Sequence, residues 1–123
     1  MTQKPNILVV DDDARWREVL TIFLASRNWN VISANDGQAA LDQFHQHPAD
    51  LVILDVMMPV MDGWELCQQL RQISDVPIMV LTARGQDNDR KKGLQLGADD
   101  YLVKPVTLRE IETRVAGLLQ HSR

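Results

Sequence analysis

Short apolar runs alternate with helix-period patterns along the 123-residue chain. Continuous apolar runs that end in polar or turn residues are typical of strands buried on both faces of a parallel sheet. The expected strands are Asn6–Val10, 29–34, Leu51–Leu54, 76–81 and 99–103. Between them, apolar residues recur at i, i+3 and i+4, which predicts helices with one buried face.

Capping signals mark several helix ends. Asp13 is placed to cap the first helix, and the Thr-Leu-Arg-Glu sequence at 107–110 is a capping box that opens the last one. The fourth helix has little apolar surface, so we expect it to be marginal, with Gly97 as its C-terminal cap.

The inward-facing residues are expected to be Trp16, Val19, Leu20, Phe23 and Leu24 in the first helix, and Leu66, Cys67, Leu70 and Ile73 in the third, at 64–73.

This alternation predicts the fold. Five strand–helix units with short connections favour a parallel sheet with helices on both faces. We therefore expect one α/β domain over residues 1–123, a flavodoxin-like (βα)5 doubly wound fold. Its five-stranded parallel sheet should have the order 2-1-3-4-5, with the switch point between strands 1 and 3.

Composition narrows the function classes. A net charge of −4 does not suggest the basic footprint of a nucleic-acid-binding domain. No apolar run approaches the roughly 20 residues of a membrane span, and the N-terminus has no signal-peptide pattern. The single cysteine, Cys67, permits no internal disulfide, so we expect a cytoplasmic protein with this residue in its core.

Polar residues end four of the predicted strands. Asp11 and Asp12 follow strand 1, Asp55 follows strand 3, Thr82 follows strand 4 and Lys104 follows strand 5. Each alone is typical of a loop or surface residue, but parallel strands bring all of them to one sheet edge. Two unit charges about 4 Å apart repel by roughly 4 kcal/mol at an effective dielectric of 20. The cluster therefore calls for a raised carboxylate pKa or a divalent cation, and oxygen ligands suit Mg²⁺.

With these residues the chain resembles the receiver domains of bacterial two-component response regulators, which are chemotaxis-Y-like, and especially those of winged-helix transcriptional regulators. The matching motifs are the apolar strand ending in Asp11-Asp12-Asp13, Asp55-Val56-Met57-Met58-Pro59 with Asp62-Gly63, Thr82-Ala83, Gly97-Ala98-Asp99-Asp100-Tyr101 and Lys104-Pro105.

The resemblance implies a role for each site residue. Asp55 would be the phosphoacceptor, self-phosphorylating and autodephosphorylating, and Tyr101 the aromatic switch residue. Asp11, Asp12, Asp55 and the Met57 carbonyl would hold Mg²⁺ or Mn²⁺. Thr82, Lys104 and the backbone N–H groups of Val56 and Ala83 would hold the phosphoryl oxygens. The Lys104-Pro105 bond would be cis.

The resemblance also implies partners. The phosphoryl donor would be a sensor histidine kinase or a phosphotransfer protein, and the output, control of transcription, would lie in a domain outside this sequence. A homodimer face would comprise helix 4, strand 5 and helix 5, with Arg90, Leu94, Asp100, Glu110 and Arg114. Lys91 and Thr113 depart from the apolar residues common on such a face, so solvated surface charges stay an alternative.

Rival interpretations remain open at this point. A small phosphohydrolase of the haloacid dehalogenase type would use Asp11 as its nucleophile, because Asp11-Asp12-Asp13 contains an Asp-x-Asp after an apolar strand. Ala14-Arg15 and the order of the later motifs disfavour it. An inert receiver-like module is disfavoured because no site residue is missing. A flavodoxin would need a Ser/Thr/Gly-rich phosphate loop where three aspartates stand.

Overall fold

The computed structural model describes residues 4–58, 60–83, 85 and 87–121, which form alternating strands and helices. Their bounds are β1 (Asn6–Val10), α1 (Ala14–Ser26), β2 (Asn30–Ala34), α2 (Gly37–Gln46), β3 (Leu51–Leu54), α3 (Gly63–Ile73), β4 (Ile78–Thr82), α4 (Asp87–Gln95), β5 (Asp100–Val103) and α5 (Leu108–His121). All strand pairings are parallel, in the order β2-β1-β3-β4-β5, which confirms the predicted fold.

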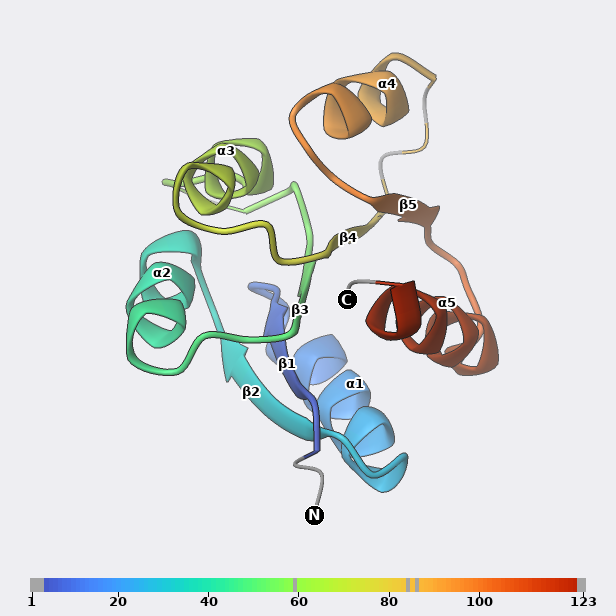
Figure 1. Ribbon diagram of the computed structural model, residues 1–123. Coiled ribbons are helices and arrows are strands. Elements are labelled where there is room, and N and C mark those ends of the chain that lie inside the picture. Colours follow the sequence, from blue (N-terminus) through green and yellow to red (C-terminus); the bar gives the residue numbers. More distant parts are fainter. Residues whose placement is uncertain (1–3, 59, 84, 86, 122–123) are drawn as a thin grey trace.

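The sheet lies between two helical layers (Figure 1). Helices α1 and α5 cover one face, and α2, α3 and α4 cover the other. Successive residues of a strand point to opposite faces, so Ile7 and Val9 of β1 join one core cluster and Leu8 and Val10 the other. The uninterrupted apolar runs of the central strands follow directly from this two-sided burial.

Several predicted boundaries move by one or two residues. β4 begins at Ile78 and includes Thr82, because its ladder with β5 runs on to the pair Thr82–Val103. α3 begins one residue early, at Gly63, since Asp62 caps it by accepting a hydrogen bond from the Glu65 N–H at 2.9 Å. β2 and β5 each begin one residue later than expected.

The helix faces agree with the sequence pattern except at their margins. Asp13 caps α1 as predicted, and Cys67 is buried, which raises the pKa of its thiol. Val19 and Ile73, which we expected to face inward, are 43% and 49% exposed. Both lie at the edge of an apolar stripe, where a 3.6-residue period does not decide between core and solvent.

No helix among the described residues combines the length and the apolar character needed to cross a membrane.

Candidate functional site

Two carboxylates lie side by side at the carboxyl end of the sheet. Asp11 and Asp55 directly follow the paired strands β1 and β3. Their backbone N–H groups continue the ladder, Asp11 donating to the Ala34 carbonyl at 3.2 Å and Asp55 to the Val10 carbonyl at 3.1 Å. Both residues are buried, at 4% and 7% exposure. The sheet itself thus holds two acidic side chains close together and away from bulk water.

Lys104 joins the two carboxylates. Its backbone N–H donates to the Thr82 carbonyl at 2.8 Å, which places it just beyond β5. Its Nζ lies 3.3 Å from Asp11 Oδ2 and 3.6 Å from Asp55 Oδ2. The Lys104-Pro105 peptide bond is cis, as the resemblance implied. The ammonium therefore offsets part of the repulsion between the two aspartates.

The ionised form of the Asp11 carboxyl remains disfavoured even with Lys104 beside it. Burial raises its pKa above the usual 3.8, and the charge of Asp55 adds to that. The Asp13 N–H, which donates to Asp11 Oδ1 at 2.9 Å, and the Lys104 ammonium both act in the opposite direction. Asp55 Oδ1 in turn accepts a hydrogen bond from the Met57 N–H at 2.9 Å. This leaves Asp55 Oδ2 as the oxygen that faces Lys104.

Four further predicted site residues lie at the same edge, because they end or directly follow β3 and β4: Val56, Met57, Thr82 and Ala83. Thr82 ends β4 and is fully buried, while Ala83 after it is exposed. Val56 is buried behind Asp55, and Met57 is 51% exposed, so its side chain points away from the core. The structure thus brings Asp11, Asp55, Thr82 and Lys104 together, as the strand ends predicted.

The donor set fits Mg²⁺ better than a metal that prefers nitrogen or sulfur. No group of three or more His, Cys, Asp or Glu side chains with metal-binding spacing is found in the described part of the chain, and Asp12 is exposed. Mg²⁺ typically takes only one or two carboxylates and completes its shell with waters and phosphate oxygens. Burial raises the pKa of Asp11, so a further positive charge beside it would favour its ionised form.

Tyr101 lies on the α2–α3–α4 side of the sheet and is 1% exposed. Its ring stacks on that of Trp64, with centroids 6.3 Å apart and planes 16° from parallel. Gly93 of α4 approaches both rings so closely that an added Cβ would lie 3.0 Å from Trp64 and 3.1 Å from Tyr101. The predicted switch residue is therefore inward and covered by α4.

The predicted dimer face carries ion pairs within the chain. Arg114 Nη1 donates to both carboxylate oxygens of Asp100, at 3.1 and 3.0 Å. Arg114 Nη2 also lies 3.6 Å from Glu110 Oε1. Arg90 and Leu94 of α4 are exposed.

Several contacts, at the site and at the opposite end of the sheet, were not foreseen from the sequence. The Lys104 ammonium lies 5.1 Å from the centroid of the Trp16 ring, and Arg17 Nη1 donates to the Asp11 carbonyl at 2.7 Å. Arg71 reaches from α3 to the Gly97 carbonyl at 3.0 Å and to Asp99 at 2.7 Å, fixing the connection before β5. For these contacts the sequence offers one clue: Trp16 and Arg17 follow the Asp11-Asp12-Asp13 cluster by about one helical turn, which places them near it.

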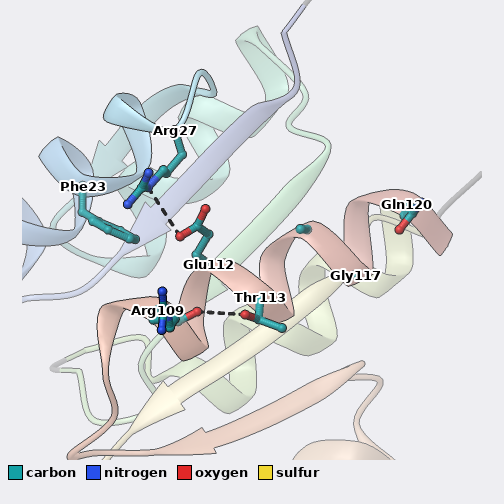
Figure 2. Close-up of a pocket in the computed structure, with 8 residues that line it drawn as sticks. Phe23, Arg27, Arg109, Glu112, Thr113, Gly117 and Gln120 are labelled. Atoms are coloured by element: carbon teal, nitrogen blue, oxygen red, sulfur yellow. Dashed lines mark hydrogen bonds and ion pairs between the residues drawn. The ribbon is translucent and has the colours of Figure 1, made fainter.

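A separate groove of about 700 Å³ lies between α1 and α5 (Figure 2). Arg27 occupies its wall, where Nε lies 3.4 Å from Glu112 Oε1 and the guanidinium lies 5.1 Å from the Phe23 ring centroid. These charges pair with each other across the two helices. The Arg27–Glu112 ion pair therefore links α1 to α5. The residues that line this groove do not reproduce the carboxylates, hydroxyl and ammonium found at the sheet edge.

The comparisons with known proteins identify this arrangement. The family model described as the response regulator receiver domain matches residues 7–116. The chain belongs to this family. The receiver domain is 48% identical over 119 residues to the probable transcriptional regulator ycf27 of Guillardia theta, covering 97% of this chain and 47% of the relative. It is 41% identical over 121 residues to the transcriptional regulatory protein ResD of Bacillus subtilis (strain 168), covering 98% and 50%.

Solved receiver structures share the fold. The Francisella response regulator 1452 receiver domain superposes with a TM-score of 0.92 at 31% identity, covering 98% of this chain and all of that one (100%). Vibrio cholerae chemotaxis protein CheY4 gives 0.89 at 30% identity, covering 94% and 98%. The chain is thus the receiver domain of a two-component response regulator and spans about half the length of the curated relatives it matches. The phosphohydrolase alternative has no support in these comparisons.

Proposed function

We propose that Asp55 is the phosphoacceptor of this receiver domain. The observation that carries the proposal is the buried Asp11–Asp55 pair with Lys104 Nζ within 3.3 and 3.6 Å of its two carboxylates. Asp55 Oδ2 attacks the phosphorus of the donor and forms an acyl phosphate. The bond from phosphorus to the donor's histidine nitrogen breaks, and its electron pair stays on that nitrogen. Water later hydrolyses the acyl phosphate and restores the carboxylate.

Each neighbouring residue has a separate task in this proposal. The Met57 N–H orients the Asp55 carboxylate through Oδ1. Lys104 and the Thr82 hydroxyl hold the phosphoryl oxygens, with the backbone N–H groups of Val56 and Ala83, because charge-assisted donors stabilise a transferring phosphoryl group.

Asp11, Asp12, Asp55 and the Met57 carbonyl would hold Mg²⁺ or Mn²⁺. The ion would supply positive charge that neutralises the phosphoryl oxygens during transfer. Asp11 is well suited to this role, since its burial next to Asp55 already disfavours the ionised form in the absence of added positive charge.

The proposed switch connects Thr82 to Tyr101 and α4. Tyr101 is inward in this structure, so phosphorylation would increase the population of this inward arrangement by drawing the Thr82 hydroxyl towards the new dianion. α4 would respond most readily, because Leu94 is 47% exposed and Gly93 is the residue that α4 buries against the Trp64–Tyr101 stack.

The test is the intact mass of the protein after incubation with acetyl phosphate and Mg²⁺. We expect one phosphoryl adduct in the parent protein, no adduct after Asp55→Ala, and a persistent adduct after Asp11→Asn at reduced rate. An adduct that survives Asp55→Ala would refute the assignment of Asp55. An adduct lost in Asp11→Ala but kept in Asp55→Ala would restore the rival nucleophile.

We further propose that a sensor histidine kinase or phosphotransfer protein supplies the phosphoryl group in the cytoplasm, and that the output is transcription. The family and the names of the relatives, which are transcriptional regulators, support this proposal. This domain itself would make no nucleic-acid contact, in keeping with its net charge of −4.

A homodimer through α4, β5 and α5 is the proposed form of the activated domain. Arg90 and Leu94 of α4 are exposed, and Asp100 of β5 forms an ion pair with Arg114 of α5, which also pairs with Glu110. Sedimentation with and without the phosphoryl mimic beryllofluoride tests this proposal. A dimer that forms only with beryllofluoride and is lost in Leu94→Asp is expected, whereas a monomer in both conditions would contradict it.

A further inference from the structure

The indole ring of Trp16 faces the ammonium of Lys104. Trp16 is the third residue of α1, and its N–H donates to the capping carboxylate of Asp13 at 3.2 Å, which fixes its backbone at the start of the helix. The ring is half-buried and packs against the core cluster beneath α1 and α5. Lys104 Nζ lies 5.1 Å from the ring centroid, within the roughly 6 Å over which an aromatic face attracts a cation.

Three groups therefore surround the Lys104 ammonium. Asp11 Oδ2 and Asp55 Oδ2 attract it from the sheet edge, and Trp16 lies on a further side. A lysine has a flexible four-carbon stem that must be ordered before its charge can act at a fixed point. The rigid indole restricts that freedom and keeps water from one side of the ammonium.

An aromatic face suits this position better than another carboxylate would. The attraction of a cation to a ring acts over a broad area and needs no aligned hydrogen bond, so the ammonium keeps its N–H groups for oxygen acceptors. A carboxylate there would compete for those N–H groups, and an aliphatic side chain would supply no attraction.

We propose that Trp16 is a positioning residue that holds the Lys104 ammonium over the Asp11–Asp55 pair and so speeds phosphoryl transfer onto Asp55. This inference rests on the function proposed above for Asp55 and Lys104. It assigns to α1 a part in the chemistry of the sheet edge that the strand ends alone do not supply.

The variants distinguish the effect of the aromatic face from the effect of side-chain volume. Trp16→Phe keeps an aromatic face, and Trp16→Leu keeps apolar volume without one. Trp29→Leu is the matched control, because Trp29 packs in the same core cluster but precedes β2, at the opposite edge of the parallel sheet. Lys104→Met removes the charge and keeps the stem, so combining it with Trp16→Leu tests whether the ring acts through the ammonium.

The first measurement is the rate of Asp55 phosphorylation by acetyl phosphate with Mg²⁺, followed by intact mass. We expect Trp16→Leu to be about fivefold slower, which equals about 1 kcal/mol at 1.36 kcal/mol per tenfold. Trp16→Phe and Trp29→Leu should stay within about twofold of the parent. In the Lys104→Met background, Trp16→Leu should add no further loss. An unchanged rate in Trp16→Leu, or the same loss with and without Lys104, would overturn the proposal.

The second measurement does not depend on phosphorylation. The ring current of Trp16 should shift the Lys104 ε-CH₂ proton resonances upfield in the parent and in Trp16→Phe, and the shift should vanish in Trp16→Leu. Resonances that do not respond to Trp16→Leu would refute the contact whatever the rates are. If the shift is present but the parent takes no phosphoryl group on Asp55, the function assigned to Asp55 fails, and the positioning role fails with it.

Discussion

Two glycines inside helices allow a direct test of how α4 is held. Gly93 lies in α4 and Gly117 in α5. Replacing an interior helical glycine by alanine gains roughly 1 kcal/mol, because alanine loses less backbone freedom on folding. At Gly117 nothing lies within 4 Å of the added Cβ, so that full gain is expected.

At Gly93 the same methyl group meets the aromatic stack. Its nearest atoms would be Trp64 Cζ3 at 3.0 Å and Tyr101 Cδ2 and Cε2 at 3.1 and 3.2 Å. Tyr101 is 1% exposed and Trp64 6%, so neither ring can swing into solvent without losing its packing. Overpacking of this kind costs about 1–3 kcal/mol. After the helical gain is subtracted, Gly93→Ala should be neutral or destabilising by up to about 2 kcal/mol.

Urea unfolding followed by far-ultraviolet circular dichroism measures both free energies of unfolding. Gly117→Ala should exceed the parent by about 1 kcal/mol, and Gly93→Ala should fall about 1–3 kcal/mol below Gly117→Ala. Near-ultraviolet circular dichroism should change in Gly93→Ala alone, since only that substitution displaces the Trp64–Tyr101 stack. A Gly93→Ala protein as stable as Gly117→Ala, with an unchanged near-ultraviolet spectrum, would refute the close packing of Gly93 against the Trp64 and Tyr101 rings.

Three further substitutions test other parts of the structure. Val60 has φ 65° and a fully exposed side chain, so Val60→Gly should raise the free energy of unfolding by about 0.5–1 kcal/mol in urea titration. Arg71→Ala should lower it by about 2 kcal/mol through loss of the bonds to Gly97 and Asp99, and Arg71→Lys should restore less than half, because an ammonium cannot span both acceptors. The raised pKa of Asp11 adds stability below pH 3.8 that is lost as pH rises through that raised value, so Asp11→Asn should be more stable than the parent at pH 7, with the gap closing on acidification.

The sequence predicts the sheet order and the main site for the same physical reason. Strands buried on both faces must be apolar throughout, so their polar ends are conspicuous, and parallel strands bring these ends to one edge. The sequence alone therefore places Asp11, Asp55, Thr82 and Lys104 together. The strand boundaries differ from the prediction, as at Thr82, because a strand ends where its neighbour stops pairing and not where its own apolar run stops.

Contacts between side chains that are far apart in the sequence could not be predicted from hydrophobic periodicity. Arg71 bonds residues 26 and 28 positions away, and Lys104 meets Trp16, which lies 88 positions earlier in the chain. Helix periodicity located Trp16 on an inward face but gave no reason to look for a cation above its ring. Gly93 likewise carries no hydrophobic signal, although it is the residue that α4 buries against the aromatic stack.

The position of Gly93 bears on which element can move when Asp55 gains charge. β3 and β4 are buried along their full length, so displacing either would expose much of the core. Residues 88–95 of α4 bury no large apolar side chain of their own, since Gly93 contacts the Trp64–Tyr101 stack and Leu94 is 47% exposed, so shifting α4 uncovers little apolar surface beyond that stack. A rearrangement that begins at Thr82 and Lys104 should therefore displace Tyr101 and α4 and leave the central strands in place. Amide hydrogen exchange should show α4 opening at a lower free energy than β3, and equal protection of the two would contradict this order.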